Sequence, residues 1–345
     1  KNIKIKNKKL KDRFDTIIKE YSNFLNKEDL ELIEIVILRY KENSHNEYYI
    51  VLLLIYWFYF FKAISIDNSL VTEEDKINIA KIEKSFKADI WWNMDEYLKE
   101  MASYDDDLFL AKSIIKYTLL NSENTYLKLV PNLDNYYRSV WFLIPLLTFK
   151  ESPFLSFYQD FYFKKMYPEE YSKLKKKHLK ITSKLELPWE YIISKINTLS
   201  NLMKRINVSW TITLRKKSYF SLYAKYNNTN KNITDSFWIR IVFNSTKELN
   251  TFKEAFEFDH IYLNKKDYIS KPKENWYKAI HYSYLTAFRT SQILVELQIK
   301  TKKMEEEMNK KKDLSHFTYT LSNKKWATLF KEVHDWYKIT KNLLV

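Results

Sequence analysis

The chain has 345 residues, no Gly, no Cys and a formal net charge of +15 at pH 7. That length is enough for two domains of ordinary size. Phosphate-binding loops built on glycine are excluded, because they need backbone conformations that only glycine adopts freely. Left-handed turn positions are therefore expected at Asn or Asp. Without cysteine the chain forms neither disulfides nor thiolate metal sites, which fits a reducing cytoplasm.

The basic charge favours anionic partners such as nucleotides, nucleic acids or acidic membranes. The chain is also rich in Lys, Asn, Ile, Tyr and Phe, a composition that AT-rich coding produces without selection for any partner. The amino terminus is basic and no apolar segment follows it, so a secretory signal peptide is not expected.

Residues 10–150 are predicted to be helical. The apolar run 48–61 carries no charge, but a membrane-spanning helix needs roughly 20 residues. A buried central helix is therefore predicted, with an interfacial or membrane segment as the alternative. Further helices are predicted in KINIAKIEKSF, DIWWNMDEYLKEM and LFLAKSIIKYTLL.

Three prolines lie within residues 139–172, at positions 145, 153 and 168. Because proline interrupts helices, short helices with breaks are predicted there. Residues 173–184 are rich in Lys and are expected to form a solvated helical face. Another helix is predicted over residues 189–206.

The pattern then changes to strands. Alternation with β-branched and aromatic residues predicts strands in SWTITLR, FWIRIVF, HIYL, IHYSYLT and ILVELQIK. Helices are predicted between them in SYFSLYAKY, STKELNTFKEAFEF and TKKMEEEMNKKK. The predicted fold is α+β, with a helical domain over residues 1–188 and a mixed sheet flanked by helices over residues 189–345.

Three carboxylates of the second half stand out. Asp235 precedes a strand, Asp267 opens the DYI segment, and Glu296 lies within an apolar strand. An acid on such a strand is costly unless it meets a metal or a cation. Asp235 and Glu296 converging at a sheet edge would suit Mg²⁺ and phosphoryl-type transfer. The alternative is a surface acid at a strand end and a salt bridge in the core.

A basic segment, LRKKSYFSLYAKY, carries Arg215, Lys217, Ser221 and Lys225. On a helix beginning near Ser218, Ser221 and Lys225 share a face. These groups suit a polyphosphate, although a solvated amphipathic face has the same pattern. Only two of the six His lie in the helical half, too few for a helical metal-dependent hydrolase, and His334–Asp335 reads as an ordinary helix-surface pair.

Four blocks in order, LRKKSYFSLYAKY, ITDSFWIRIVF, DYISKPKENWYKAIH and VELQIKTKKM, resemble the synthetase domain of the RelA/SpoT-homologue alarmone enzymes. They cover about 105 residues. Upstream, KLVPNLDNYYR resembles a decayed motif of that family's HD-type hydrolase domain, with Pro131 in place of a metal-binding Asp. The resemblance implies a degenerate hydrolase domain without hydrolase activity, and the regulatory domains found downstream in the long enzymes are not expected.

The resemblance implies that the 3′-hydroxyl of GDP or GTP attacks the β-phosphate of ATP, giving (p)ppGpp, the alarmone of the stringent response, and AMP. By the same resemblance, Asp235 and Glu296 are the catalytic pair and bind Mg²⁺, with Glu296 as second metal ligand or base. ATP is assigned to Arg215, Lys217, Ser221, Lys225 and Arg240. The guanine nucleotide is assigned to Lys273, Asn275, Tyr277, His281 and Gln298, with Tyr277 stacking on the base and Gln298 orienting the strand end beside Glu296.

This chain departs from the family where it has Leu214, Trp238, Trp276 and Lys300. The family has Gly at positions 214 and 276, a small residue at 238 and Arg at 300. Three explanations stay open for the tryptophans: a tolerated side chain that points outward, a decaying enzyme, or a genetic code in which the codon read as Trp means Gly. The mass of the intact native protein tests the last.

The sequence thus predicts a cytoplasmic GTP pyrophosphokinase with ATP and GDP or GTP as substrates and no membrane association. One alternative is a catalytically dead relic that regulates by binding nucleotide, RNA or a partner protein. Another is a pyrophosphotransferase acting on adenosine nucleotides or tRNA. The sequence does not indicate the oligomeric state or the GDP or GTP preference, and nothing in it supports ribosome or tRNA contact.

Overall fold

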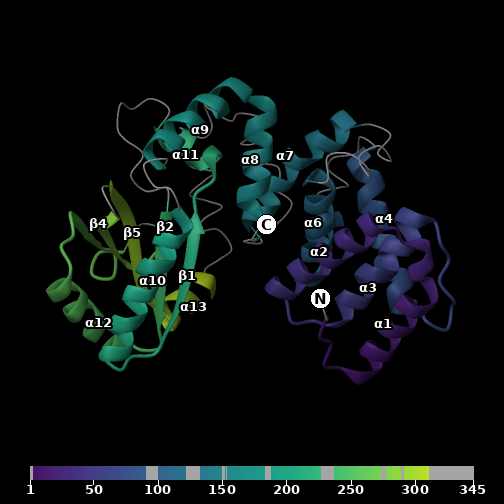
Figure 1. Cartoon of the computed structure of the whole chain (residues 1–345), viewed down its shortest axis with the longest axis horizontal. Helices are drawn as coiled ribbons and strands as arrows, with labels where there is room; N and C mark the ends of the chain where they lie inside the picture. Colours follow the sequence, from purple (N-terminus) through teal and green to yellow (C-terminus); the bar gives the residue numbers. More distant parts are fainter. Residues whose placement is uncertain are drawn as a thin grey trace. The chain divides into compact units, whose positions relative to one another are not determined.

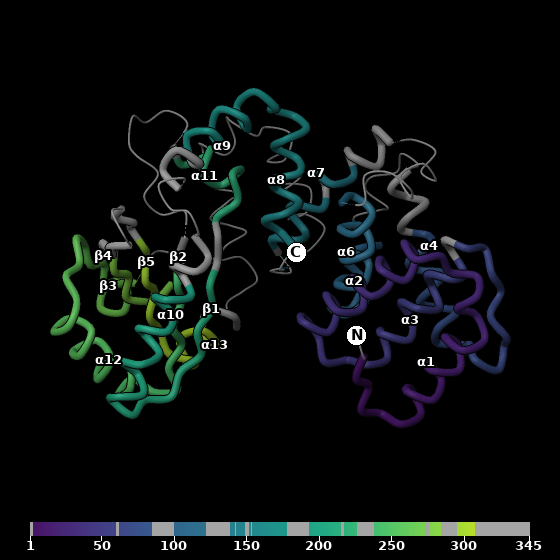
Figure 2. The backbone as a smooth tube through the Cα atoms, in the orientation of Figure 1, coloured from purple at the N-terminus to yellow at the C-terminus, as the bar shows by residue number. Residues whose placement is uncertain are grey.

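The computed structural model describes residues 3–90, 100–121, 133–149, 152, 154–182, 188–226, 237–272, 277–288 and 291–310. Figure 1 shows the elements, and Figure 2 traces the same backbone. The described chain forms two compact units, which divide between Tyr158 and Gln159. The predicted domain boundary at residues 188 and 189 lies further along the chain and stays a prediction.

The first unit is helical, as predicted. Its elements are α1 (Lys8–Tyr21), a 3₁₀ turn (Ser22–Phe24), α2 (Lys27–Asn43), α3 (Tyr48–Tyr56), a π-helical turn (Trp57–Phe61), α4 (Glu73–Ile90), α6 (Asp106–Asn121), α7 (Leu133–Phe149) and the start of α8 (Leu155–Met166). Capping fixes where α2 begins, since the side chain of Asn26 accepts a hydrogen bond from Asp29 N–H and that of Asp29 accepts one from Asn26 N–H.

The apolar run at residues 48–61 is the central helix of this unit. Every side chain from Tyr49 to Phe58 is buried, because the segment is apolar on all sides and must be surrounded by other helices. The predicted buried helix is confirmed. Among the described residues, no helix is long and apolar enough to cross a membrane.

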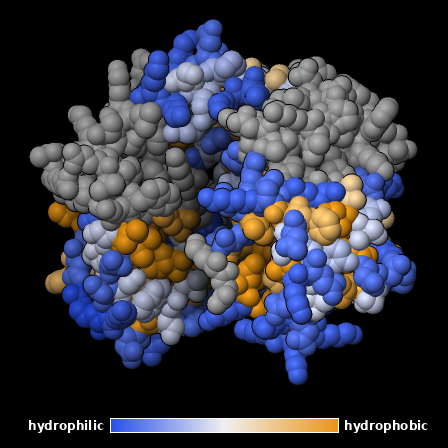
Figure 3. Space-filling view, turned by 45° about the vertical axis from the view of Figure 1, so that its right-hand side comes forward, coloured by the Kyte–Doolittle hydropathy of each residue, from blue (hydrophilic) through white to orange (hydrophobic). Residues whose placement is uncertain are grey.

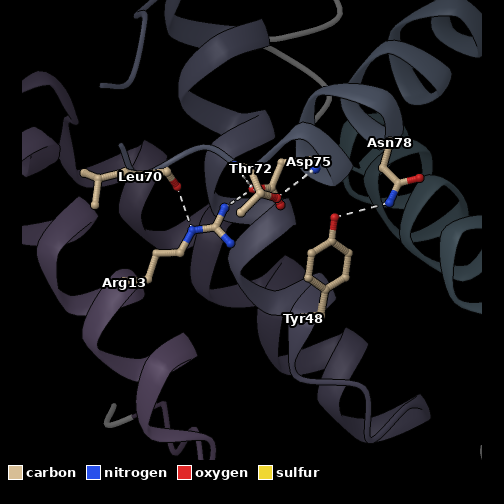
Figure 4. A network of polar contacts seen from close by, with 6 residues as sticks. All are labelled: Arg13, Tyr48, Leu70, Thr72, Asp75 and Asn78. Atoms are coloured by element: carbon tan, nitrogen blue, oxygen red, sulfur yellow. Dashed lines mark hydrogen bonds and ion pairs between the residues drawn. The ribbon is translucent and has the colours of Figure 1, made fainter. Parts of the chain in front are cut away.

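Polar contacts connect α1 to the beginning of α4 (Figure 4). The Arg13 guanidinium pairs with Asp75, whose side chain is fully buried, and Arg13 Nε donates to the carbonyl of Leu70 at 2.6 Å. Asp75 also accepts from Thr72 N–H at 2.6 Å, which caps α4. The contacts with Asp75 reach Oδ2 of a buried carboxylate at a helix start, so their role is structural.

Short helices with breaks are found over residues 139–172, as predicted, but no break falls at Pro145, because α7 continues through this proline. A proline inside a helix costs about 3 kcal/mol through a lost hydrogen bond and a steric clash. Leu143, Ile144, Leu146 and Leu147 around it are all completely buried. Burying each of them contributes about 1.5–3 kcal/mol, which offsets that cost. Pro168, in contrast, opens α9 (Pro168–Thr182), where the missing N–H has no consequence.

The second unit contains a five-stranded sheet and the remaining helices. Its elements are α9, α10 (Pro188–Arg205), β1 (Trp210–Lys216), α11 (Tyr219–Tyr226), β2 (Phe237–Phe243), α12 (Thr246–Asp259), β3 (Asn264–Asp267), β4 (Ile280–Phe288), β5 (Ser291–Thr301) and α13 (Lys302–Lys310). The strand order is β1-β2-β5-β4-β3. Only β2 and β5 pair in parallel, so the sheet is mixed, as predicted.

One face of the sheet carries the core. Ile239, Ile241 and Phe243 of β2 pack with residues of β4 and β5 against Leu199, Leu202 and Met203 of α10 and Leu249, Phe252 and Phe256 of α12. Alternate residues of a strand point to opposite faces. The positions between these apolar ones, which include 238, 240, 296 and 298, therefore share the other face.

Two further predictions are wrong, one of them only in part. HIYL lies before β3, and Ile261 and Leu263 are 89% and 61% exposed, so their alternation did not reflect burial in a sheet. The polar segment NKKD forms the strand instead, because an edge strand pairs through its backbone. Left-handed backbone occurs at Asn207, as predicted, but also at Ala63.

Hydrophilic residues cover much of the coloured surface in Figure 3, between smaller apolar patches.

Candidate active site

The face of the sheet opposite the core carries a row of polar side chains. The register places Trp238 of β2 beside Glu296 of β5, and Arg240 beside Gln298. His281 of β4 lies opposite Gln298 on its other side. Paired residues of neighbouring strands project to the same face. The strand β2, which is distant in the sequence, and the consecutive strands β4 and β5 thus bring these predicted site residues together.

Glu296 is the centre of this group. Its Oε1 accepts from Gln298 Nε2 at 2.7 Å and lies 3.2 Å from His281 Nδ1. Burial alone would raise the pKa of Glu296, but the hydrogen bonds from His281 and Gln298 and the charge of Lys217 lower it to about 2. Glu296 is therefore an anion throughout the physiological pH range. These donors offset the free-energy cost of placing a charge on an apolar strand.

Tyr277 joins the group from the segment before β4. Its hydroxyl lies 2.8 Å from His281 Nε2 and 3.4 Å from Gln298 Oε1. Burial raises the pKa of Tyr277 to about 12, so the phenol stays protonated. The rings of Tyr268 and Tyr277 approach His281 edge-on, at 5.1 and 5.5 Å. The imidazole is thus held on three sides, by a carboxylate and two phenol rings.

Arg240 extends the row toward α13. Its guanidinium lies over the ring of Trp238, 4.5 Å from the centroid. Its hydrogen bond to Gln298 Oε1 is long, at 3.4 Å, and Glu305 lies 3.7 Å away. Glu305 makes a closer pair with Lys300, at 2.6 Å. The sequence did not predict a role for Glu305. The sequence feature that could have indicated it is the even spacing of Lys300 from Glu296 and Gln298. This spacing puts Lys300, the partner of Glu305, on the same face as the other two.

The predicted phosphate-binding segment is a strand followed by a helix. Ser218 caps the start of α11, since its Oγ accepts from Ser221 N–H at 3.2 Å. Ser221 Oγ accepts from Ser218 Oγ at 2.8 Å. Lys225 is exposed and Lys217 half-buried, and Lys217 acts on Glu296 through its charge. The predicted helix with Ser221 and Lys225 one turn apart is confirmed, but their contact with a phosphate stays a prediction.

Several predicted residues lie outside the described part of the chain. These are Asp235, Lys273, Asn275 and Trp276, together with the side chain of Arg215. The convergence of Asp235 with Glu296 therefore stays a prediction. Asp267 is described, and its carboxylate accepts from the N–H groups of Ile269 and Ser270 at 2.9 and 3.0 Å. This carboxylate closes a turn, and it is not part of the group around Glu296.

Glu296 suits a hard cation such as Mg²⁺, which prefers oxygen ligands. Both of its hydrogen bonds reach Oε1, and no hydrogen bond from the described residues reaches Oε2. Within the described ranges, no group of three His, Cys, Asp or Glu is placed to hold a metal. Glu296 would therefore share the cation with groups outside them, among which Asp235 is the predicted one, and with the phosphates of a substrate.

Comparison with known proteins finds a family similar to the segment that carries this site. The family described as "Region found in RelA / SpoT proteins" matches residues 214–324, a segment that begins in β1 and includes Arg240, Tyr277, His281, Glu296 and Gln298. The resemblance that the sequence motifs predicted is thus confirmed for this segment.

Individual relatives of this chain carry names from the metabolism of the same alarmone. The protein named guanosine-3′,5′-bis(diphosphate) 3′-pyrophosphohydrolase in Borreliella burgdorferi is 31% identical over 157 residues, or 44% of this chain and 22% of the relative. The GTP pyrophosphokinase of Photobacterium angustum is 27% identical over 154 residues, or 43% of this chain and 20% of the relative. The chain spans 16% to 23% of the length of the curated relatives it matches.

Among solved structures, small alarmone synthetase 1 of Bacillus subtilis bound to its product pppGpp is similar, with a TM-score of 0.34 and 18% identity over 48% of this chain and 94% of that one. Small alarmone synthetase 2 of the same organism gives a TM-score of 0.33 and 20% identity over 44% and 88%. These values are too low to support an activity.

Proposed function

We propose that the chain is a (p)ppGpp synthetase, which transfers pyrophosphate from ATP to the 3′-hydroxyl of GDP or GTP. The observation that carries this proposal is the ionised Glu296, held by His281 and Gln298 on the polar face of the sheet within the RelA/SpoT segment. The names of the relatives include both synthesis and hydrolysis of this alarmone. The RelA/SpoT segment carries the group around Glu296, which supports synthesis.

In the proposed reaction, the 3′-oxygen of the acceptor forms a bond to the β-phosphorus of ATP. The bond between that phosphorus and the oxygen bridging to the α-phosphate breaks, and AMP leaves with that oxygen. The proton of the 3′-hydroxyl passes to a base or to solvent. Catalysis of such transfers depends on positioning and on stabilising charge, which are the tasks available to Arg240, Lys217 and Glu296.

The pKa of Glu296, lowered to about 2, bears on its role. A general base works best when its pKa lies near the operating pH, so this carboxylate is a weak base. It is better suited to ligate Mg²⁺ or to accept a hydrogen bond from the acceptor hydroxyl. When bound, Mg²⁺ would neutralise charge on the transferred phosphates. Tyr277 would offer its ring to the guanine base, as a stacking surface that tolerates substituents.

We further propose that the helical unit does not hydrolyse the alarmone. The motif with Pro131 lies outside the described residues, so this proposal depends on the sequence.

The test is a transfer assay with Mg²⁺, ATP labelled at its terminal phosphates, and GDP or GTP, using the parent chain, Glu296→Gln and Trp276→Gly. Labelled ppGpp or pppGpp from the parent that is lost in Glu296→Gln is expected. Product from Trp276→Gly alone would mean that Trp276 blocks the acceptor. Absence of product from both the parent chain and Trp276→Gly would contradict the proposal and favour a catalytically dead protein that regulates by binding. Release of pyrophosphate from added ppGpp would contradict the loss of hydrolase activity.

A further inference from the structure

The contact between Trp238 and Arg240 raises a question that the proposed reaction does not answer. The two residues are neighbours on one face of β2, since residues two apart in a strand point the same way. Trp238 is 7% exposed although it lies on the polar face, directly opposite Glu296 in the register. A large aromatic side chain there takes space beside the carboxylate, so it needs a reason.

The surroundings of Arg240 supply that reason. Its side chain is 24% exposed, and its contacts with Glu305 and Gln298 measure 3.7 and 3.4 Å. Charge-assisted hydrogen bonds are usually about 2.7–2.9 Å long. Arg240 Nε is buried and has no acceptor among the described residues. This guanidinium is therefore a largely buried cation whose donors have no close acceptor within the described part of the chain.

A planar guanidinium with available donors matches a phosphate group, which it can bind through two parallel hydrogen bonds. The indole ring beneath it attracts the cation without cancelling its charge, whereas a second close carboxylate would cancel it. Glu305 lies 3.7 Å from Arg240, but it pairs more closely with Lys300, at 2.6 Å. Arg240 thus keeps positive charge on the site-bearing face.

We propose that Trp238 is a positioning residue, which holds the Arg240 guanidinium in place for a phosphate group of the nucleotide. The inference rests on the proposed function for the identity of the ligand. It also gives the tryptophan at this position a use, because a small side chain cannot support a guanidinium in this way. Trp238 acts through Arg240 and does not itself need to touch substrate.

The test measures the affinity of the full chain for ATP in the presence of Mg²⁺, by calorimetry without acceptor, with inorganic tripolyphosphate as a second probe. Trp238→Leu is expected to weaken binding about 2- to 30-fold, the range that a cation–π contact provides. Trp238→Phe keeps a ring and is expected to restore most of the affinity. The matched control is Phe243→Leu, which shortens a buried aromatic on the opposite face of the same strand.

A double-mutant cycle separates positioning from packing. In an Arg240→Gln background, Trp238→Leu should cause no further loss of affinity. An equal loss with and without Arg240, or a loss matched by Phe243→Leu, would overturn the inference. A parent chain that binds neither ATP nor tripolyphosphate would overturn it as well. A parent chain that binds ATP but makes no ppGpp would refute only the proposed function, because affinity alone decides the role of Trp238.

Discussion

Glu296 provides the most direct check on the geometry of the site, through its own titration. Its pKa is lowered from the ordinary value of 4.5 to about 2, although the side chain is 19% exposed and burial alone would raise it. That lowering corresponds to roughly 3 kcal/mol of preference for the carboxylate in the folded chain. Because the folded pKa lies below the unfolded value, this stabilisation is complete above pH 4.5 and is lost as the pH falls toward 2.

The assay is carbon NMR of the chain labelled at the glutamate carboxyl carbons, with the Glu296 resonance identified by its absence from Glu296→Gln. We expect it to stay at the ionised position down to about pH 3. His281→Phe and Gln298→Leu each remove a hydrogen bond to Oε1, so both should raise the pKa. The control is Glu248→Gln, which removes an acid from the capping box of α12 and should leave the titration unchanged.

A Glu296 resonance that titrates above pH 4 in the parent chain would refute the arrangement around Oε1. It would also restore the possibility that this carboxylate acts as the general base, since its pKa would then be closer to neutrality. With the pKa at about 2, in contrast, any loss of transfer activity as the pH falls below neutrality should not follow the protonation of Glu296.

Three further outcomes are expected. Arg13→Ala leaves Asp75 buried without its cation and should destabilise the helical unit by about 3–5 kcal/mol, measured by urea unfolding; a change under 1 kcal/mol would show that the pair is weak. Tyr277→Leu should weaken guanine nucleotide binding by about 1–3 kcal/mol, and Tyr277→Phe by much less, measured by calorimetry; equal losses would exclude ring stacking. Pro145→Ala restores a donor inside α7 and should raise stability by up to about 3 kcal/mol; a lower unfolding midpoint would mean that the helix is built around the proline ring.

The sequence predicted much of the fold because its periodicities follow from local geometry. Apolar residues at alternate positions of FWIRIVF and ILVELQIK require strands with one buried face, and the structure has β2 and β5 there. The predictions that failed also relied on local pattern. HIYL alternates without being buried, and Pro145 is held in a helix by its completely buried neighbours. In both cases the environment decided the outcome, and local pattern does not report it.

The sequence by itself determined which side chains share a face, because a strand has a period of two residues. It placed Glu296 with Gln298, and Trp238 with Arg240. Only the tertiary structure set β2 parallel to β5 and β4 antiparallel to it, which brings His281 to Glu296 and Arg240 to Glu305. These contacts join residues that are 15 and 65 positions apart, and pairing at that range depends on how the whole sheet assembles.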